Sequence, residues 1–224
     1  MKKIKIIIDS ASKIKVFEKM IDSNITYEEI ATEYEDEFVG QVVLAESRNH
    51  LHELSEDVDE DDSEIILHDT TSPDGYRVYL RSLSFIFIKA VKTLFPEKRV
   101  LVEHSISSGL YFTIRNGEKL VRLDSRMRDA LKEEMRRIVY EDKKIHREEM
   151  PVHKAYELFS NLGRKDKANL LKYREKGTIA VYHLGGDVDS FFGFMVPSTR
   201  YVNTFDLELF DHGIVVMGPE EDKK

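Results

Sequence analysis

The longest apolar pattern of the chain lies in residues 81–114 and its flanks, and it predicts a buried helix followed by two strands. Apolar side chains recur at the i, i+3, i+4 and i+7 positions of one helical face, and others widen that face. They are Leu80, Leu83, Phe85, Phe87, Ile88, Val91, Leu94 and Phe95. Pro96 is expected to end the helix, because proline lacks the amide proton that a helix interior needs. The runs at 100–106 and 109–114 predict two strands joined by a short turn.

A second pattern fills the N-terminal third of the chain. Apolar residues predict a strand pair at 4–9 and 13–18, with the turn at Asp9, Ser10, Ala11 and Ser12. The segment 25–35 then predicts a short helix capped near Asn24 or Thr26, and 38–47 and 63–69 predict further strands. Two strands, a helix and more strands in this order indicate a small β-grasp module of the ubiquitin type.

The segment TTSPDGY, residues 70–76, is rich in turn-forming residues and is the best linker candidate. We therefore expect two domains, residues 1–68 and residues 69–224. In the second, apolar periodicity predicts helices at 124–142, 152–163 and 165–175, and the rest is strand-like at 144–150 and 178–217. The predicted fold class is α+β, with helices laid on an antiparallel sheet in the second domain.

Composition and charge narrow the classes of function. The chain of 224 residues has a formal net charge of -8 and no cysteine, which excludes disulfides, zinc-thiolate sites and cysteine nucleophiles. Residues 1–68 carry 7 Lys and Arg against 18 Asp and Glu, so most of the negative charge lies there and residues 69–224 are close to neutral. Because an acidic segment repels phosphates and a neutral one does not attract them, strong nonspecific nucleic-acid binding is not expected. The sequence lacks a signal peptide or a membrane-spanning run, so we expect a cytoplasmic protein without a membrane partner.

Two patterns raise the question of a metal site. Asp57, Asp59 and Asp61 resemble the opening of a calcium loop, but Asp62 and His68 stand where that loop needs glycine and glutamate, so a solvated loop is favoured. His50 and His52 alternate as on one side of a strand, without a third ligand nearby in the sequence. The standard motifs of P-loop kinases, dinucleotide enzymes, zinc proteases and α/β-hydrolases are missing from the sequence.

Several longer segments together resemble a known pair of domains. Residues 1–68 resemble a TGS domain, and residues 69–224 resemble the second additional domain of threonyl-tRNA synthetases, which hydrolyses mischarged tRNA. The likeness rests on three segments in order: RSLSFIFIKAVKTLFP (81–96), HREEMPVHKAYELFSNLG (146–163) and DSFFGFMVPSTRYVNTFDL (189–207). They are similar to the family's H-S-x-x-H helix ending AVKELFP, its E-x-x-x-x-x-E-A-I-E-L-F helix and its D-L-C-R-G-P-H-V-P-N-T segment.

The resemblance implies a metal-ligand set of three His and one Cys, and this chain departs from it at every position. The first His falls on Arg81, the second on Phe85, the Cys on Phe191 and the last His on Met195. These four are degenerate metal-site positions, and we expect neither a metal nor catalytic residues of that kind.

A second resemblance is to the N-terminal region of long bacterial uridine kinases, through residues 81–91, 103–111, 170–174 and 192–201. It implies a noncatalytic region that senses a ligand, docks RNA or regulates its own C-terminal kinase domain. ATP and Mg²⁺ are then expected only for that absent P-loop domain, and no cofactor for this chain.

The polar residues in the matched segments define a candidate pocket for a small polar ligand: Arg81, Glu103, His104, Ser105, Asp189, Ser198 and Thr199. Ordinary structural roles are favoured for each of them: an ion pair of Arg81 with Asp189 or Glu103, a hydrogen-bonded core position for His104, and a turn after Pro197 shaped by Ser198 and Thr199. One alternative is a metal-independent aminoacyl-tRNA editing-type hydrolase with His104 as base and Ser105 or a water as nucleophile. Another is a protein-interaction module.

Overall fold

The computed structural model describes residues 1–174 and 177–219, and it divides into two compact units. The first unit comprises Met1–Lys143 together with the segment that starts at Phe194, and the second is Lys144–Gly193. The expected boundary between residues 68 and 69 falls inside the first unit. Glu175, the last residue of the predicted third helix of the second domain, lies outside the described residues. No helix within 1–174 and 177–219 is long and apolar enough to cross a membrane.

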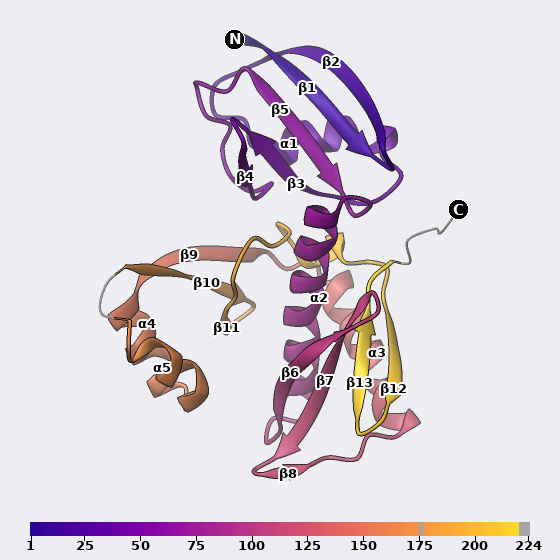
Figure 1. Cartoon of the computed structure of the whole chain (residues 1–224), viewed down its shortest axis with the longest axis vertical. Coiled ribbons are helices and arrows are strands. Elements are labelled where there is room, and N and C mark those ends of the chain that lie inside the picture. The colour runs from indigo at the N-terminus through magenta and orange to yellow at the C-terminus, as the bar shows by residue number, and fades with distance from the viewer. Residues whose placement is uncertain (175–176, 220–224) are drawn as a thin grey trace. The chain divides into compact units, whose positions relative to one another are not determined.

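The N-terminal part of the first unit is a five-stranded sheet with the strand order β2-β1-β5-β3-β4 (Figure 1). Its strands are β1 Lys2–Ser10, β2 Lys13–Ile21, β3 Val42–Ser47, β4 His50–His52 and β5 Glu64–Asp69. The central strands β1 and β5 are parallel, and the other neighbours are antiparallel. This arrangement confirms the predicted β-grasp module.

Local sequence explains where these elements turn and begin. Ala11 and Ser12 both have positive φ angles, 48° and 60°, as the two central residues of the tightest hairpin turns require. Helix α1, Tyr27–Glu33, is capped by Thr26. The Thr26 hydroxyl accepts a hydrogen bond from Glu29 N, and the Glu29 carboxylate accepts one from Thr26 N. This capping box selects Thr26 over Asn24 as the cap. Tyr27 and Ile30 of α1 are fully buried.

The predicted linker is mostly helical. Helix α2 runs from Pro73 to Leu94, so residues 73–76 form its first turn, and Ser72 caps it by accepting from Gly75 N at 3.1 Å. A Cβ built on Gly75 would lie 2.0 Å from the carbonyl oxygen of Asp69. Glycine is therefore required here, because the first turn of α2 passes directly against the end of β5.

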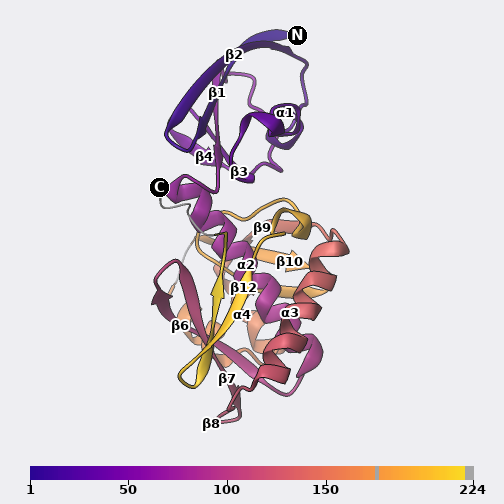
Figure 2. The ribbon, with the colours of Figure 1, turned by 90° about the vertical axis from the view of Figure 1, so that its right-hand side faces the viewer.

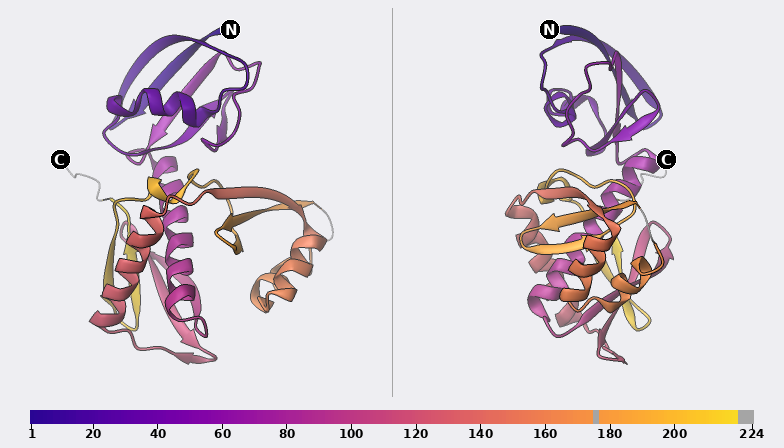
Figure 3. Two further views of the ribbon diagram at one scale, coloured as in Figure 1. Left: turned by 180° about the vertical axis from the view of Figure 1, so that it is seen from behind. Right: turned by 90° about the vertical axis from the view of Figure 1, so that its left-hand side faces the viewer.

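The rest of the first unit is a second antiparallel sheet, ordered β12-β13-β7-β6, with α2 and α3 on one face (Figure 2, Figure 3). Its elements are β6 Arg99–Ile106, β7 Gly109–Asn116, β8 Lys119–Leu120, α3 Ser125–Tyr140, η2 Thr199–Tyr201, β12 Asp206–Phe210 and β13 Gly213–Met217. Phe87 of α2 and Phe112 of β7 are both fully buried, with ring centroids 4.7 Å apart. The buried helix on a strand pair that the apolar pattern predicted is confirmed.

The second unit has a three-stranded antiparallel sheet, ordered β11-β10-β9, and two helices. Its elements are β9 Ile145–Pro151, α4 Val152–Asn161, α5 Lys165–Leu171, β10 Thr178–Leu184 and β11 Asp187–Ser190. Its small core is built from both helices and from β10, with Ala155 and Phe159 of α4 and Val181 of β10 fully buried. The predicted α+β class is confirmed in both units.

Candidate functional site

Two of the four degenerate metal-site positions, Arg81 and Phe85, are on α2, which contacts the segment that contains a third, Met195. Arg81 donates from Nη1 to the carbonyl oxygen of Phe194 at 2.6 Å, and Ser82 Oγ accepts from Val196 N at 3.0 Å. The backbone N of Met195 in turn donates to Glu53 Oε1 at 2.8 Å. The side chains of Phe85 and Met195 are each only 1% exposed. Arg81 therefore binds a backbone carbonyl, and apolar side chains occupy two of the positions that the resemblance assigns to histidine.

Phe191, the fourth such position, lies in the second unit, after β11. Among residues 1–174 and 177–219, no group of three or more His, Cys, Asp or Glu side chains is arranged to hold a metal ion.

Three of the predicted pocket residues lie on an open edge of the second sheet. Glu103, His104 and Ser105 are exposed on β6, which is the edge strand next to β7. Thr113 Oγ1 donates to Glu103 Oε1 at 2.5 Å, and the ring of His104 lies 5.3 Å from that of Tyr111. The strand register shifts between Val102 and His104, so β6 is irregular at Glu103. His104 is thus an exposed edge residue and not a core histidine.

Ser198 and Thr199 are buried and hold the end of α3. Thr199 Oγ1 donates to the carbonyl oxygen of Ile138 at 2.8 Å and accepts from Lys143 N at 3.0 Å. Ser198 Oγ donates to the carboxylate of Asp142. The Thr199 hydroxyl thus satisfies backbone groups where α3 ends, and the Ser198 hydroxyl binds a side-chain carboxylate just after the helix.

Asp189 is buried behind a cavity of the second unit: it does not line the cavity, but it contacts Lys167, which does. It is 2% exposed, and Lys167 Nζ lies 2.8 Å from its Oδ1, while Arg164 Nη2 lies 3.5 Å from its Oδ2. Lys167 Nζ also donates to the carbonyl oxygen of Ser190 at 2.8 Å. The buried carboxylate therefore fixes Lys167 of α5 against the end of β11.

Lys167 lines a cavity of about 540 Å³ that lies entirely within the second unit. Polar and aromatic side chains line it together, among them Arg147, Glu149, Lys167, Arg174, Ser190, Phe191 and Phe192. The Lys167 ammonium lies 5.4 Å from the centroid of the Phe191 ring, and the Arg174 guanidinium lies 5.6 Å from that of Phe192. Phe192 is largely exposed to solvent, with 79% of its surface accessible.

Cations beside exposed aromatic rings are the chemistry that binds single-stranded nucleic acid, because cations attract phosphates and aromatic faces stack on bases. This basic-aromatic pocket, defined by Arg147, Lys167, Arg174, Phe191 and Phe192, was missed in the sequence. Its signal is present in residues 164–174, which hold five Lys and Arg against one Asp. Charge summed over 69–224 conceals this local excess.

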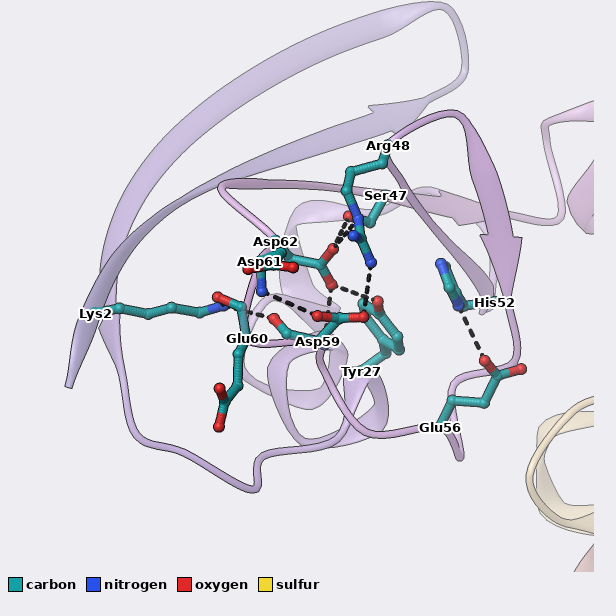
Figure 4. Close-up of polar contacts among 10 residues, drawn as sticks. All are labelled: Lys2, Tyr27, Ser47, Arg48, His52, Glu56, Asp59, Glu60, Asp61 and Asp62. Atoms are coloured by element: carbon teal, nitrogen blue, oxygen red, sulfur yellow. Dashed lines mark hydrogen bonds and ion pairs between the residues drawn. The ribbon is translucent and has the colours of Figure 1, made fainter.

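The acidic loop of the β-grasp module is ordered by its own hydrogen bonds (Figure 4). Asp62 is buried and accepts from the hydroxyls of Tyr27 and Ser47 and from Asp59 N, while Arg48 pairs with Asp59 and Asp62. The prediction of a solvated loop is therefore wrong for Asp62, whose carboxylate organises the loop from inside.

The two histidines beside this loop have different surroundings. His52 lies with its Nδ1 2.9 Å from Glu56 Oε2, and its ring stacks on Tyr27 at 5.0 Å. His50 is exposed at the start of β4. The arrangement of His52 is that of a packed structural residue.

Comparison with known proteins gives several related matches. The chain is 29% identical to a threonine-tRNA ligase of Clostridioides difficile over 191 residues, which are 85% of this chain and 29% of the relative. It is 31% identical to that of Lawsonia intracellularis over 144 residues, 64% of this chain and 22% of the relative, and 29% identical to that of Rickettsia bellii over 190 residues. No family model matches. The chain thus spans less than a third of the length of these relatives.

These relatives correct the functional interpretation. The chain was expected to be the noncatalytic N-terminal region of a uridine kinase, but the matched proteins are threonine-tRNA ligases. The kinase interpretation is therefore wrong. The chain is similar to threonyl-tRNA synthetases, in agreement with the TGS-like and editing-like part of the resemblance.

Proposed function

We propose that this chain is an aminoacyl-tRNA synthetase-related region of the editing type, which receives the single-stranded aminoacylated end of a tRNA and promotes hydrolysis of its ester. In this proposal residues 1–68 form the TGS-like domain and residues 69–224 the editing-like domain. The partner is then an RNA, and the site of action is the cytoplasm, where translation takes place.

The observation that carries the proposal is the basic-aromatic pocket, found in a chain whose relatives are threonine-tRNA ligases. Phosphates of the acceptor end would pair with Lys167 and Arg174, and an unstacked base would lie on the exposed ring of Phe192. Asp189 holds Lys167 in place before the RNA arrives, which reduces the entropy that binding costs.

The hydrolytic step would use a water that is not bound to a metal, since the positions that the resemblance assigns to the metal-binding His and Cys carry Arg81, Phe85, Phe191 and Met195. His104 of the first unit is the proposed general base, with Ser105 or a water as the proposed nucleophile, and the RNA-binding part of the proposal rests on the second unit alone. The His104 and Ser105 side chains are both exposed to solvent on β6 and are therefore accessible to a substrate.

The test is deacylation of mischarged tRNA, with correctly charged tRNA as the comparison. Arg174→Gln, which leaves the buried ion pair of Lys167 with Asp189 intact, should weaken tRNA binding about fivefold or more, because a lost phosphate contact costs binding energy and lowers the salt dependence of binding. Lys154→Gln, an exposed cation of α4 that does not line the pocket, is the matched control. Absence of both tRNA binding and deacylation would refute the proposal.

His104→Ala separates the chemistry from binding. Loss of deacylation with unchanged tRNA binding is the expected result. Deacylation that persists at the same rate in His104→Ala removes the histidine from the mechanism, and the water would then need another base.

A further inference from the structure

The first unit contains a second hollow, unrelated to the basic-aromatic pocket, where the β-grasp module meets the segment after Pro197. Two cavities of about 250 and 300 Å³ open there, and they share Glu35, Gln41 and Asn203 as walls. We refer to them together as the polar hollow. Its size suits a small metabolite, because pockets for drug-sized ligands begin at about 300 Å³.

Two opposite charges face this hollow without neutralising each other. Arg200 and Glu35 line the same cavity, yet no ion pair joins them in the part of the chain that the structure describes. The guanidinium of Arg200 has only distant carboxylates, Glu28 at 3.8 Å and Asp142 at 3.9 Å, and 57% of its side chain is exposed. Glu35 is exposed, and none of the ion pairs within 1–174 and 177–219 involves it.

The other walls mix apolar and polar residues, and several of the polar ones are held in place. Gln41 and Asn203 offer carboxamides, which both donate and accept hydrogen bonds. Tyr79 Oη donates to the carbonyl oxygen of Thr204 at 2.8 Å and accepts from Thr204 N at 2.9 Å, which fixes the wall of the second cavity. Tyr201 Oη donates to Glu28 at 2.7 Å, which fixes the residue beside Arg200.

From this arrangement we propose that the polar hollow binds a free amino acid as its zwitterion, with the carboxylate on Arg200, the ammonium on Glu35 and the carboxamides of Gln41 and Asn203 around them. A planar guanidinium matches a carboxylate with two parallel hydrogen bonds. A nucleobase fits less well, because the Arg200 guanidinium already lies 5.3 Å from the centroid of the Tyr201 ring that a base would stack on.

This inference does not depend on tRNA binding or deacylation, since the hollow lies in the first unit and the basic-aromatic pocket in the second. Either proposal can therefore fail while the other stands.

The experiment is a calorimetric titration of the 224-residue chain with each of the protein amino acids. At least one should bind saturably, and its N-acetyl derivative and its amide should each bind about tenfold or more weakly, because each lacks one of the two charges. Arg200→Gln and Glu35→Gln should weaken binding by a similar factor. Asp36→Asn and Arg126→Gln, exposed residues outside the hollow, are matched controls that should bind like the unaltered chain.

Glu35→Gln keeps the experiment interpretable, because Glu35 takes part in no described ion pair and its loss should leave the fold intact. No binding by any amino acid would overturn the proposal. Binding that both variants retain would also overturn it, and so would binding that needs Arg200 but not Glu35, since that identifies a site for anions only.

Discussion

Lys167 Nζ lies 2.8 Å from Oδ1 of Asp189, and the two partners differ in their access to water: the lysine side chain is 22% exposed and the aspartate side chain 2%. This difference predicts unequal effects of removing each partner. A buried carboxylate without its cation is costly, whereas a lysine that reaches water is not.

Lys167→Met should therefore destabilise the second unit by about 3 kcal/mol, the range for breaking a buried ion pair, and Asp189→Asn by about 1 kcal/mol. Amide hydrogen exchange of β10 measures this locally and does not require the whole chain to unfold in one step. Equal losses of stability in the two variants would contradict this account and would mean that Arg164, 3.5 Å from Asp189, neutralises the carboxylate when Lys167 is removed.

Phe192 should contribute to RNA binding by stacking. Its ring is exposed beside Arg174, so Phe192→Ala removes a stacking platform without opening a cavity in the core. The expected loss is about 1–3 kcal/mol of binding free energy for a short single-stranded RNA, measured by fluorescence anisotropy. Tyr156→Ala, an aromatic residue of α4 outside the pocket, is the control and should bind RNA unchanged.

Ser82→Ala should destabilise the first unit. The buried Ser82 hydroxyl donates to the carbonyl oxygen of Val78 at 2.8 Å and accepts from Val196 N at 3.0 Å. Alanine leaves the Val196 amide without that acceptor, at a cost of about 1–3 kcal/mol. Urea unfolding of this variant and of Ser105→Ala, on the exposed edge strand, tests the difference, since Ser105→Ala should change stability by less than about 0.5 kcal/mol.

Asp62 should make the β-grasp module sensitive to acid. Burial opposes ionisation of Asp62, but the bonds from Ser47, Tyr27 and Asp59 N and the charge of Arg48 outweigh it and lower its pKa. A lowered folded-state pKa means that the carboxylate's stabilisation is present above its unfolded pKa of about 3.9 and is lost as pH falls through the folded value.

The melting temperature of Asp62→Asn should accordingly be lower than that of the unaltered chain at neutral pH and should fall less below about pH 4. Asp36→Asn, an exposed acidic position of the same module, is the control. A parallel acid dependence in Asp62→Asn and the unaltered chain would contradict this account.

Gly75→Ala tests the close approach of α2 to β5. Alanine is favoured over glycine in helices by about 1 kcal/mol, but its Cβ would lie 2.0 Å from a backbone oxygen that has little freedom to move. We expect the clash to decide the sign, with a loss of about 1–3 kcal/mol in unfolding free energy. Asp74→Ala at the neighbouring, partly buried position should cost no more than about 1 kcal/mol.

The sequence determined the elements of this protein, because local rules act within a few residues. Helical periodicity located α2, and strand alternation located β1 and β2. The capping signals located the start of α1 to within two residues, because they left only Asn24 and Thr26 as candidates for the cap. The resemblance to threonyl-tRNA synthetases was likewise available from the order of three segments.

Only the tertiary structure decided which polar residues meet. Asp189 lies against Lys167, 22 residues earlier in the chain, and Asp62 turns inward to Tyr27 and Ser47. Glu103, His104 and Ser105, adjacent in sequence and grouped as pocket residues, are exposed on an edge strand instead. Contacts between distant segments depend on strand register and on the burial of whole elements. The local sequence of one segment specifies neither of these, because both are set together with the segment that it contacts.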